Sequence, residues 1–199
     1  MSRVFIVPDV HLKPWIFGRA SKLIREGSYD EIVLLGDLVD DWGEEYNLEL
    51  YEETFDAAAA FVTKYPNTRW CYGNHDVSYL WEARESGYSA YARETVVRRV
   101  HNLEQALAAG RSSFIFRIDE VLFSHAGLTK SFAANHFALP AAPSVNEIDE
   151  MLLRINRMGR KELWEDDSPI WARPQYGEME LYPELMLQVV GHTPVESLL

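Results

Sequence analysis

The sequence contains a single cysteine, Cys71, in 199 residues, so an internal disulfide is impossible. A zinc site built from several cysteines is excluded for the same reason. Long apolar runs are also missing, and the N-terminal run ends at Pro8 and Asp9, which makes it too short for a signal peptide or a membrane span. We therefore expect a cytoplasmic protein without a membrane partner.

Positive charge is scarce, since 19 lysines and arginines stand against 31 aspartates and glutamates, for a formal net charge of -12. Such a surface repels polyanions, so a nucleic-acid polymer is not expected as a partner. A phosphate-binding enzyme with this charge needs a local positive centre, which bound metal ions supply. A role of the negative charge in solubility alone stays open.

The remaining composition is that of an ordinary globular protein, with 47% hydrophobic and 25% charged residues. A chain of this length is large enough for one domain with a hydrophobic core. We therefore expect a single domain over residues 1–199.

Strands and helices are predicted to alternate in the first half of the chain. Short apolar runs predict buried strands at Val4–Val7, Ile32–Leu35 and Arg69–Tyr72, with helices at Ile16–Glu26 and Leu48–Tyr65. This alternation is typical of a parallel sheet with right-handed crossovers. Polar side chains that follow the three strands are then expected at one edge of the sheet.

The second half of the chain is less regular. Its predicted elements are a helix at Ala90–Ala109, a hairpin of Phe114–Ile118 and Val121–Ser124, a helix start with a capping box at Ser144 and Glu147, and a strand at Leu185–Val190.

Five short polar segments each follow a predicted strand. They are Asp9-Val-His11, Gly36-Asp-Leu-Val-Asp40, Gly73-Asn-His-Asp76, Ser124-His-Ala-Gly127 and Gly191-His-Thr-Pro194. Carboxylates and imidazoles together suit Mn, Fe or Zn better than Ca or Mg. Each segment alone is a weak signal, but four of the six histidines fall within the five segments. Their number, order and placement predict a metal site.

In this order, the five segments resemble the motifs of the calcineurin-like metallophosphoesterases, and the match extends from Asp9 to Pro194. The residues of the last two segments are similar to those of the branch that contains protein Ser/Thr phosphatases and bacterial diadenosine tetraphosphatases. The resemblance implies an α/β fold, a two-sheet αββα sandwich, with the site at the carboxyl ends of the strands.

The resemblance also implies a ligand set for two divalent metal ions. Asp9 and His11 would bind the first ion, Asp37 would bridge both, and Asn74, His125 and His192 would hold the second. Manganese is the expected metal, with iron or zinc as alternatives. A hydroxide that bridges the two ions would attack the phosphorus.

Two further residues have implied catalytic roles. His75 would be the general acid that protonates the leaving group, and Asp40 would orient it.

The sequence departs from the protein phosphatases at three positions where they have arginine. Asp41, Tyr72 and Val190 stand there, so bidentate phosphate contacts are missing. Arg173, in a Trp-x-Arg-Pro segment of that branch, is then the candidate for binding the substrate phosphate. A surface arginine beside a core tryptophan is the alternative.

These observations together predict a metal-dependent phosphoesterase that acts on a phosphomonoester or a nucleotide phosphoanhydride, with a small phosphorylated substrate or nucleotide as its partner. A protein Ser/Thr phosphatase and a non-catalytic binding protein on the same fold are the alternatives. Family members usually continue beyond the last histidine motif, so the end at Leu199 indicates either a minimal member or a truncated sequence.

Overall fold

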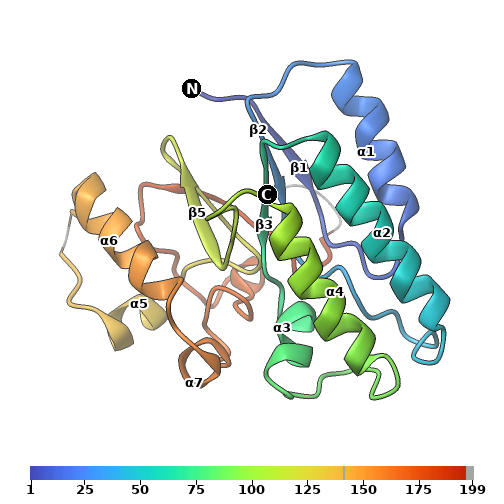
Figure 1. The fold of residues 1–199 in the computed structure, drawn as a ribbon. Coiled ribbons are helices and arrows are strands. Elements are labelled where there is room, and N and C mark those ends of the chain that lie inside the picture. Colours follow the sequence, from blue (N-terminus) through green and yellow to red (C-terminus); the bar gives the residue numbers. More distant parts are fainter. Residues whose placement is uncertain (141, 196–199) are drawn as a thin grey trace. The chain divides into compact units, whose positions relative to one another are not determined.

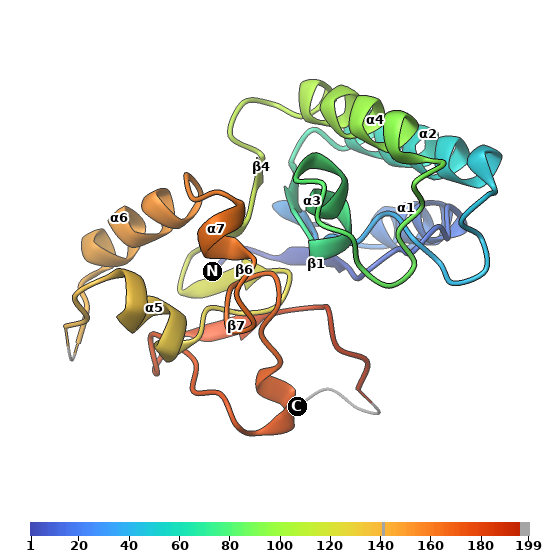
Figure 2. The same ribbon diagram turned by 90° about the horizontal axis from the view of Figure 1, so that it is seen from below.

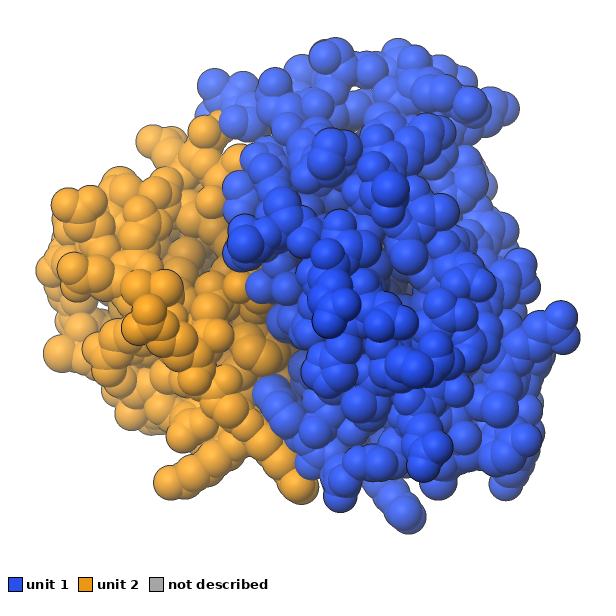
Figure 3. All heavy atoms as spheres, viewed as in Figure 1, with its two compact units in different colours: residues 1–112 blue, residues 113–199 orange. Residues whose placement is uncertain are grey.

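The computed structural model describes residues 1–140 and 142–195. The chain divides into two compact units, residues 1–112 and residues 113–199 (Figure 3). The single domain expected from the length would contain both units and stays a prediction. The end of the chain at Leu199 lies outside the described residues.

The first unit is built on a parallel sheet. Strands β1 (Val4–Val7), β2 (Glu31–Leu34) and β3 (Thr68–Cys71) lie side by side in chain order, followed by the short strand β4 (Ser112–Ser113). β1 pairs with β2 and β2 with β3, both in parallel. The predicted alternation of strands and helices is thereby confirmed.

Three helices pack next to one another in this unit. They are α1 (Trp15–Arg25), α2 (Leu48–Lys64) and α4 (Arg93–Ala106), and α2 contacts both of the others (Figures 1 and 2). The expected apolar face of α2 is confirmed, because Tyr51, Phe55, Ala58 and Val62 are all buried. These side chains belong to the hydrophobic core of the unit, together with residues of the sheet.

One short helix of this unit was not predicted from the sequence. α3 (Asn74–Leu80) begins directly after β3 and Gly73, so the third motif is the first turn of a helix. Seven residues are too few to produce a recognisable apolar period. The start of the helix is stabilised by Asp76, whose carboxylate accepts a hydrogen bond from Gly73 N at 2.9 Å.

The second unit carries a smaller mixed sheet. β5 (Ile115–Ile118) and β6 (Val121–Ser124) form the predicted antiparallel hairpin, and β7 (Leu187–Val189) pairs with β6 in parallel. β7 is shorter than the predicted strand at Leu185–Val190, because Met186 N donates to Pro183 O in a turn that precedes it. 

The helices of this unit are α5 (Lys130–His136), α6 (Val145–Ile155) and α7 (Arg160–Leu163), with a 3-10 turn at Pro174–Tyr176. The predicted capping box of α6 is confirmed: Ser144 Oγ accepts from Glu147 N at 3.3 Å, and Ser144 N donates to Glu147 Oε2 at 2.8 Å. 

The α/β class with two sheets is confirmed by one parallel and one mixed sheet. Within the described part of the chain, every helix is too short or too polar to cross a lipid bilayer.

Asp76 connects the second and third motifs. Its fully buried carboxylate accepts from Asp37 N at 2.9 Å through Oδ2 and from Leu38 N at 2.8 Å through Oδ1, in addition to Gly73 N. Three backbone donors at the ends of β2 and β3 therefore depend on one side chain. The loop that carries Asp37 is fixed to the start of α3 by these bonds.

We expect the replacement Asp76→Ala to lower the free energy of unfolding by about 3 kcal/mol or more, because each buried donor left without an acceptor costs about 1–3 kcal/mol. Urea unfolding of metal-free protein, followed by circular dichroism, measures the change. Asp56→Ala is the control, since this exposed aspartate only pairs with Arg99 on the surface and its loss should cost less than about 1 kcal/mol. Equal losses in the two variants would contradict the role of Asp76.

Candidate metal centre

The first unit brings three of the predicted metal ligands together. Asp9 and His11 follow β1, and Asp37 follows β2, the neighbouring strand. Each residue offers one ligand atom, and these atoms all lie within 4.8 Å of one another. The expectation that parallel strand ends deliver their polar groups to one place is therefore met for these three residues.

The protonation of His11 is fixed by its contacts. His11 Nδ1 lies 2.8 Å from Asp40 O and 3.2 Å from Val39 O, and a carbonyl oxygen can only accept. Nδ1 therefore carries the proton of the neutral ring, which leaves the lone pair on Nε2. That atom lies 3.6 Å from Asp37 Oδ2. A histidine whose second nitrogen donates to a carbonyl is the usual arrangement at metal sites.

Several candidate residues have a left-handed backbone. The φ angles are 43° at His11, 47° at Asp37, 66° at Asp40 and, in the second unit, 64° at His192. Residues other than glycine rarely adopt this conformation, and it costs about 1–3 kcal/mol where it occurs. Such backbone strain concentrates at functional sites, where the surrounding structure holds it.

Two glycines allow the second and third motifs to approach closely. A Cβ at Gly73 would lie 2.1 Å from Asp37 Oδ1, and a Cβ at Gly36 would lie 2.5 Å from Gly73 N. Gly36 also has a φ of 101°, which disfavours any other residue. The space left by Gly73 is occupied by the Asp37 carboxylate, which accepts from His75 N at 3.0 Å.

His75 and Asp40 form a buried pair next to these ligands. His75 Nδ1 lies 2.9 Å from Asp40 Oδ2, and the other carboxylate oxygen accepts from the hydroxyls of Tyr51, at 3.0 Å, and Tyr79. The ring of His75 meets the ring of His11 edge to face at a centroid distance of 5.2 Å. Asp40 thus holds the ring of His75 by its Nδ1.

The two tyrosines act as fixed hydrogen-bond donors. Burial and, after it, the negative charge of Asp40 raise the pKa of Tyr51 and of Tyr79 well above the ordinary value. Both hydroxyls therefore remain protonated. Burial also raises the pKa of the Cys71 thiol, so this cysteine is an unreactive residue of the core.

Asn74, the remaining predicted ligand of the first unit, is the first residue of α3 and is buried. It lies between Gly73 and His75, which both contact Asp37. Its role as a ligand stays a prediction.

The second unit brings His125 and His192 together. His125 directly follows β6, and His192 follows the parallel neighbour β7 by three residues. His125 Nε2 lies 3.0 Å from His192 Nδ1, and Gly191 N donates to His125 O at 2.8 Å. Two imidazoles that meet at adjacent strand ends are the arrangement expected for a pair of ligands to one metal ion.

Arg173 contacts the last motif of the same unit. Its Nη1 donates to Thr193 Oγ1 at 3.1 Å, and among the described residues no carboxylate lies within ion-pair distance of its guanidinium. Arg173 lines a hollow of about 320 Å³, and the other lining residues are Asp166, Trp171, Tyr176, Glu178 and Met179. The ring of Trp171 meets that of His192 at 5.6 Å. Phosphate binding by Arg173 stays a prediction, but the residue is attached to the histidine motif.

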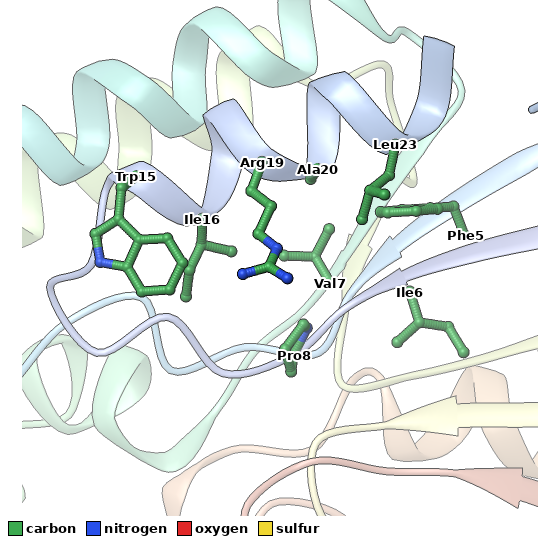
Figure 4. Close-up of a pocket in the computed structure, with 9 residues that line it drawn as sticks. All are labelled: Phe5, Ile6, Val7, Pro8, Trp15, Ile16, Arg19, Ala20 and Leu23. Carbon is green, nitrogen blue, oxygen red and sulfur yellow. The ribbon is translucent and has the colours of Figure 1, made fainter. Parts of the chain in front are cut away.

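A second hollow, of about 300 Å³, lies between β1 and α1 (Figure 4). Its lining is apolar except for Arg19, and none of the candidate site residues takes part in it. It therefore lacks the groups that hydrolysis requires.

Carboxylate and imidazole side chains at the carboxyl ends of sheet strands are groups that could hold a metal ion in an α/β fold. The family model of the calcineurin-like phosphoesterases matches residues 2–196, and the chain belongs to this family. The match spans both compact units. No curated protein matches the chain.

A solved structure that is similar to the chain is that of a protein serine/threonine phosphatase from Saccharomyces cerevisiae with similarity to human phosphatase PP5. The identity is 16% and the TM-score 0.37, over 92% of this chain and 48% of the yeast chain. The chain thus spans about half the length of that structure. A likeness at this level carries no argument about the substrate.

Sequence reasoning missed three residues that position this site. Asp76 stands three residues after Gly73 in the third motif, and an acid at this spacing is typical of a helix start. Tyr79 lies four residues after His75, on the same face of α3, and that spacing was the available signal. Tyr51 belongs to the apolar face of α2, and nothing in the sequence marks its hydroxyl.

We expect Gly73→Ala to weaken Mn²⁺ binding by about tenfold or more, the usual loss when the support of a metal ligand is disturbed. The added methyl group would overlap Asp37 Oδ1 and displace this carboxylate. Isothermal titration calorimetry measures the affinity. Gly18→Ala is the matched control, because Gly18 lies inside α1 with open space around it. This variant should bind metal normally and gain about 0.5–1 kcal/mol in stability. Normal Mn²⁺ affinity in Gly73→Ala would refute the close packing.

Proposed function

We propose that the chain is a dinuclear metal-dependent phosphoesterase that hydrolyses a phosphomonoester or a nucleotide phosphoanhydride. One observation carries the proposal: the ligand atoms of Asp9, His11 and Asp37 lie within 4.8 Å of one another, and the His75–Asp40 pair contacts them through the ring of His11. Membership of the calcineurin-like phosphoesterase family supports the same reaction class.

The donor set fits divalent metal ions. It combines carboxylate oxygens with an imidazole whose free lone pair is on Nε2, a set that suits Mn, Fe or Zn. The proposed ligands are Asp9, His11, Asp37, Asn74, His125 and His192. Bound there, two such ions would supply positive charge to the phosphate oxygens and make a water molecule more acidic. Manganese and a cytoplasmic location stay predictions.

His75 is the proposed general acid. In hydrolysis, the bond from phosphorus to the leaving oxygen breaks while a bond to a water oxygen forms. The leaving oxygen takes a proton from His75 Nε2, and His75 regains one from solvent. Asp40, with Oδ2 on His75 Nδ1 and Oδ1 on two tyrosine hydroxyls, holds the ring and stabilises its positive charge.

This chain has fewer arginines that could bind the substrate phosphate than the protein phosphatases have. Asp41 is paired with Lys13 at 2.9 Å, and the Tyr72 hydroxyl donates to Glu104 of α4. Neither offers a cation to a substrate. Arg173, which lacks a carboxylate partner among the described residues, is therefore the proposed phosphate contact.

A panel of phosphopeptides, nucleoside phosphates and dinucleotides on metal-loaded protein separates this proposal from its alternatives. Preference for phosphopeptides would favour a protein Ser/Thr phosphatase. A chain that binds metal but hydrolyses nothing would be a binding protein on the same fold.

We expect about two equivalents of Mn²⁺ per chain by elemental analysis, as in other two-metal sites, and activity that is lost with EDTA and restored by metal. Asp37→Asn should lower the occupancy of both ions, because it removes the charge expected to bridge them. Asp41→Asn removes one negative charge from the same loop and serves as the control, which should keep both ions. One ion or none in the unaltered protein would refute the dinuclear proposal.

We expect His75→Asn to keep both metal ions and to slow hydrolysis of alkyl or seryl phosphates by about 10²–10⁴-fold, since these leaving oxygens need a proton. Nitrophenyl phosphate should suffer much less, because nitrophenolate leaves without one. Steady-state kinetics with both esters and metal analysis make the comparison. Equal losses on the two esters would exclude the acid role, and loss of metal would make His75 a ligand.

A further inference from the structure

Trp42 is an exposed aromatic side chain next to two histidines of the site. Its ring lies 5.7 Å from that of His11 and 6.0 Å from that of His75, the latter at an interplanar angle of 76°. The side chain nevertheless remains 59% exposed. An indole that contacts the site with one part of its surface and leaves most of it open is available to a ligand.

The indole is supported by the loop between α3 and α4. A Cβ at Gly87 would lie 3.4 Å from Asp40 Cβ and 3.7 Å from the Cε2 and Nε1 atoms of Trp42, so the loop passes close to one edge of the ring. The loop is anchored in turn, because Ser89 N donates to the Tyr79 hydroxyl at 2.9 Å and that hydroxyl binds Asp40. Trp42 and the His75–Asp40 pair therefore share one rigid support.

The position of Trp42 relates it to the leaving group rather than to the phosphate. In the proposed function, the leaving oxygen lies at His75 Nε2, so the rest of the leaving group must extend past the side chains that surround His75. Trp42 and His11 both contact the ring of His75, and Trp42 is the more exposed of the two.

The charged groups near this position do not favour an anionic leaving group. Asp41, the neighbour of Trp42, already neutralises Lys13. Partial burial raises the pKa of Glu85, whereas the charge of nearby His75 lowers it, which places another acid on this side of the histidine. A neutral, flat group is the chemistry that this surface accommodates.

We propose that Trp42 determines the specificity of this site for phosphomonoesters. Its ring would pack against the aromatic part of the leaving group, which is either an aryl group or the base of a nucleoside. The proposal rests on the proposed function, because His75 defines where the leaving group lies. Aromatic contacts of this kind prefer offset or edge-to-face geometry, which an indole exposed on its outer face permits.

The test compares kcat/KM of the metal-loaded full chain and of Trp42→Ala on three substrates: phenyl phosphate, adenosine 5′-monophosphate and glycerol 2-phosphate. We expect about a tenfold loss for the two aromatic substrates, carried mainly by KM, and a several-fold smaller loss for glycerol 2-phosphate. Each substrate is compared with itself, so differences in intrinsic reactivity cancel. Trp42→Phe, which keeps an aromatic ring, should recover most of the loss.

Tyr46→Ala is the matched control, since Tyr46 is an exposed aromatic residue in the same segment whose ring contact is with Tyr91. It should show no selective loss. Equal losses of Trp42→Ala on all three substrates, or no loss, would overturn the proposal.

A second measurement separates this inference from the proposed function. If the unaltered chain hydrolyses none of these phosphomonoesters and no nucleotide phosphoanhydride, the proposed function fails, and calorimetric binding of phenylphosphonate and methylphosphonate still tests Trp42. Tighter binding of the phenyl compound that disappears in Trp42→Ala supports the contact. Equal affinity for the two compounds overturns it.

Discussion

The hydrogen bonds of one buried carboxylate hold the carboxyl-terminal edge of the sheet in the first unit together. Asp76 accepts from the backbone of Asp37, Leu38 and Gly73, and so ties the end of β2 to the end of β3 and the start of α3. Charge-assisted bonds to backbone donors are among the stronger ones in proteins. Without them, the strained backbone at Asp37 would lose one of the contacts that hold it, since its carbonyl oxygen would still accept from Val10 N and His11 N. The placement of the proposed metal ligand Asp37 thus depends partly on a residue that is not itself expected to bind metal.

The backbone strain at this edge is offset by the packing of the rest of the unit. His11, Asp37 and Asp40 adopt left-handed φ angles, and Gly36 and Gly73 leave no room for a side chain between the motifs. Each of these features disfavours the fold locally. The parallel sheet and its buried helices supply the compensating burial, because the core of this unit draws on β1, β2, β3 and the helices that cover them. The free energy of core burial therefore offsets the unfavourable backbone conformations of the polar groups at the carboxyl-terminal edge of the sheet.

The sequence predicted the parts of this design that depend on periodicity and strand order. The strands at Val4–Val7 and Val121–Ser124 and the helix from Leu48 agree with the structure because their apolar patterns are regular. The clustering of Asp9, His11 and Asp37 followed from parallel strand ends. The hydroxyls of Tyr51 and Tyr79 could not be predicted, since a buried tyrosine in an apolar stripe looks like any core aromatic residue until its partner, Asp40, is located in space. The loops of the second unit lack a period, and Arg173 was proposed there only through the resemblance.

The acids of the first unit differ in how their charge is balanced, and the difference bears on metal binding. Asp40 is surrounded by two hydroxyls and an imidazole, and Asp76 by three backbone amides, so both are stabilised by the protein alone. Asp9 and Asp37 instead converge with the lone pair of His11 Nε2, so that three electron-rich atoms lie within 4.8 Å in a chain of net charge -12. A metal cation bound between these three atoms would relieve this repulsion, whereas Asp40 and Asp76 already have hydrogen-bond donors around them.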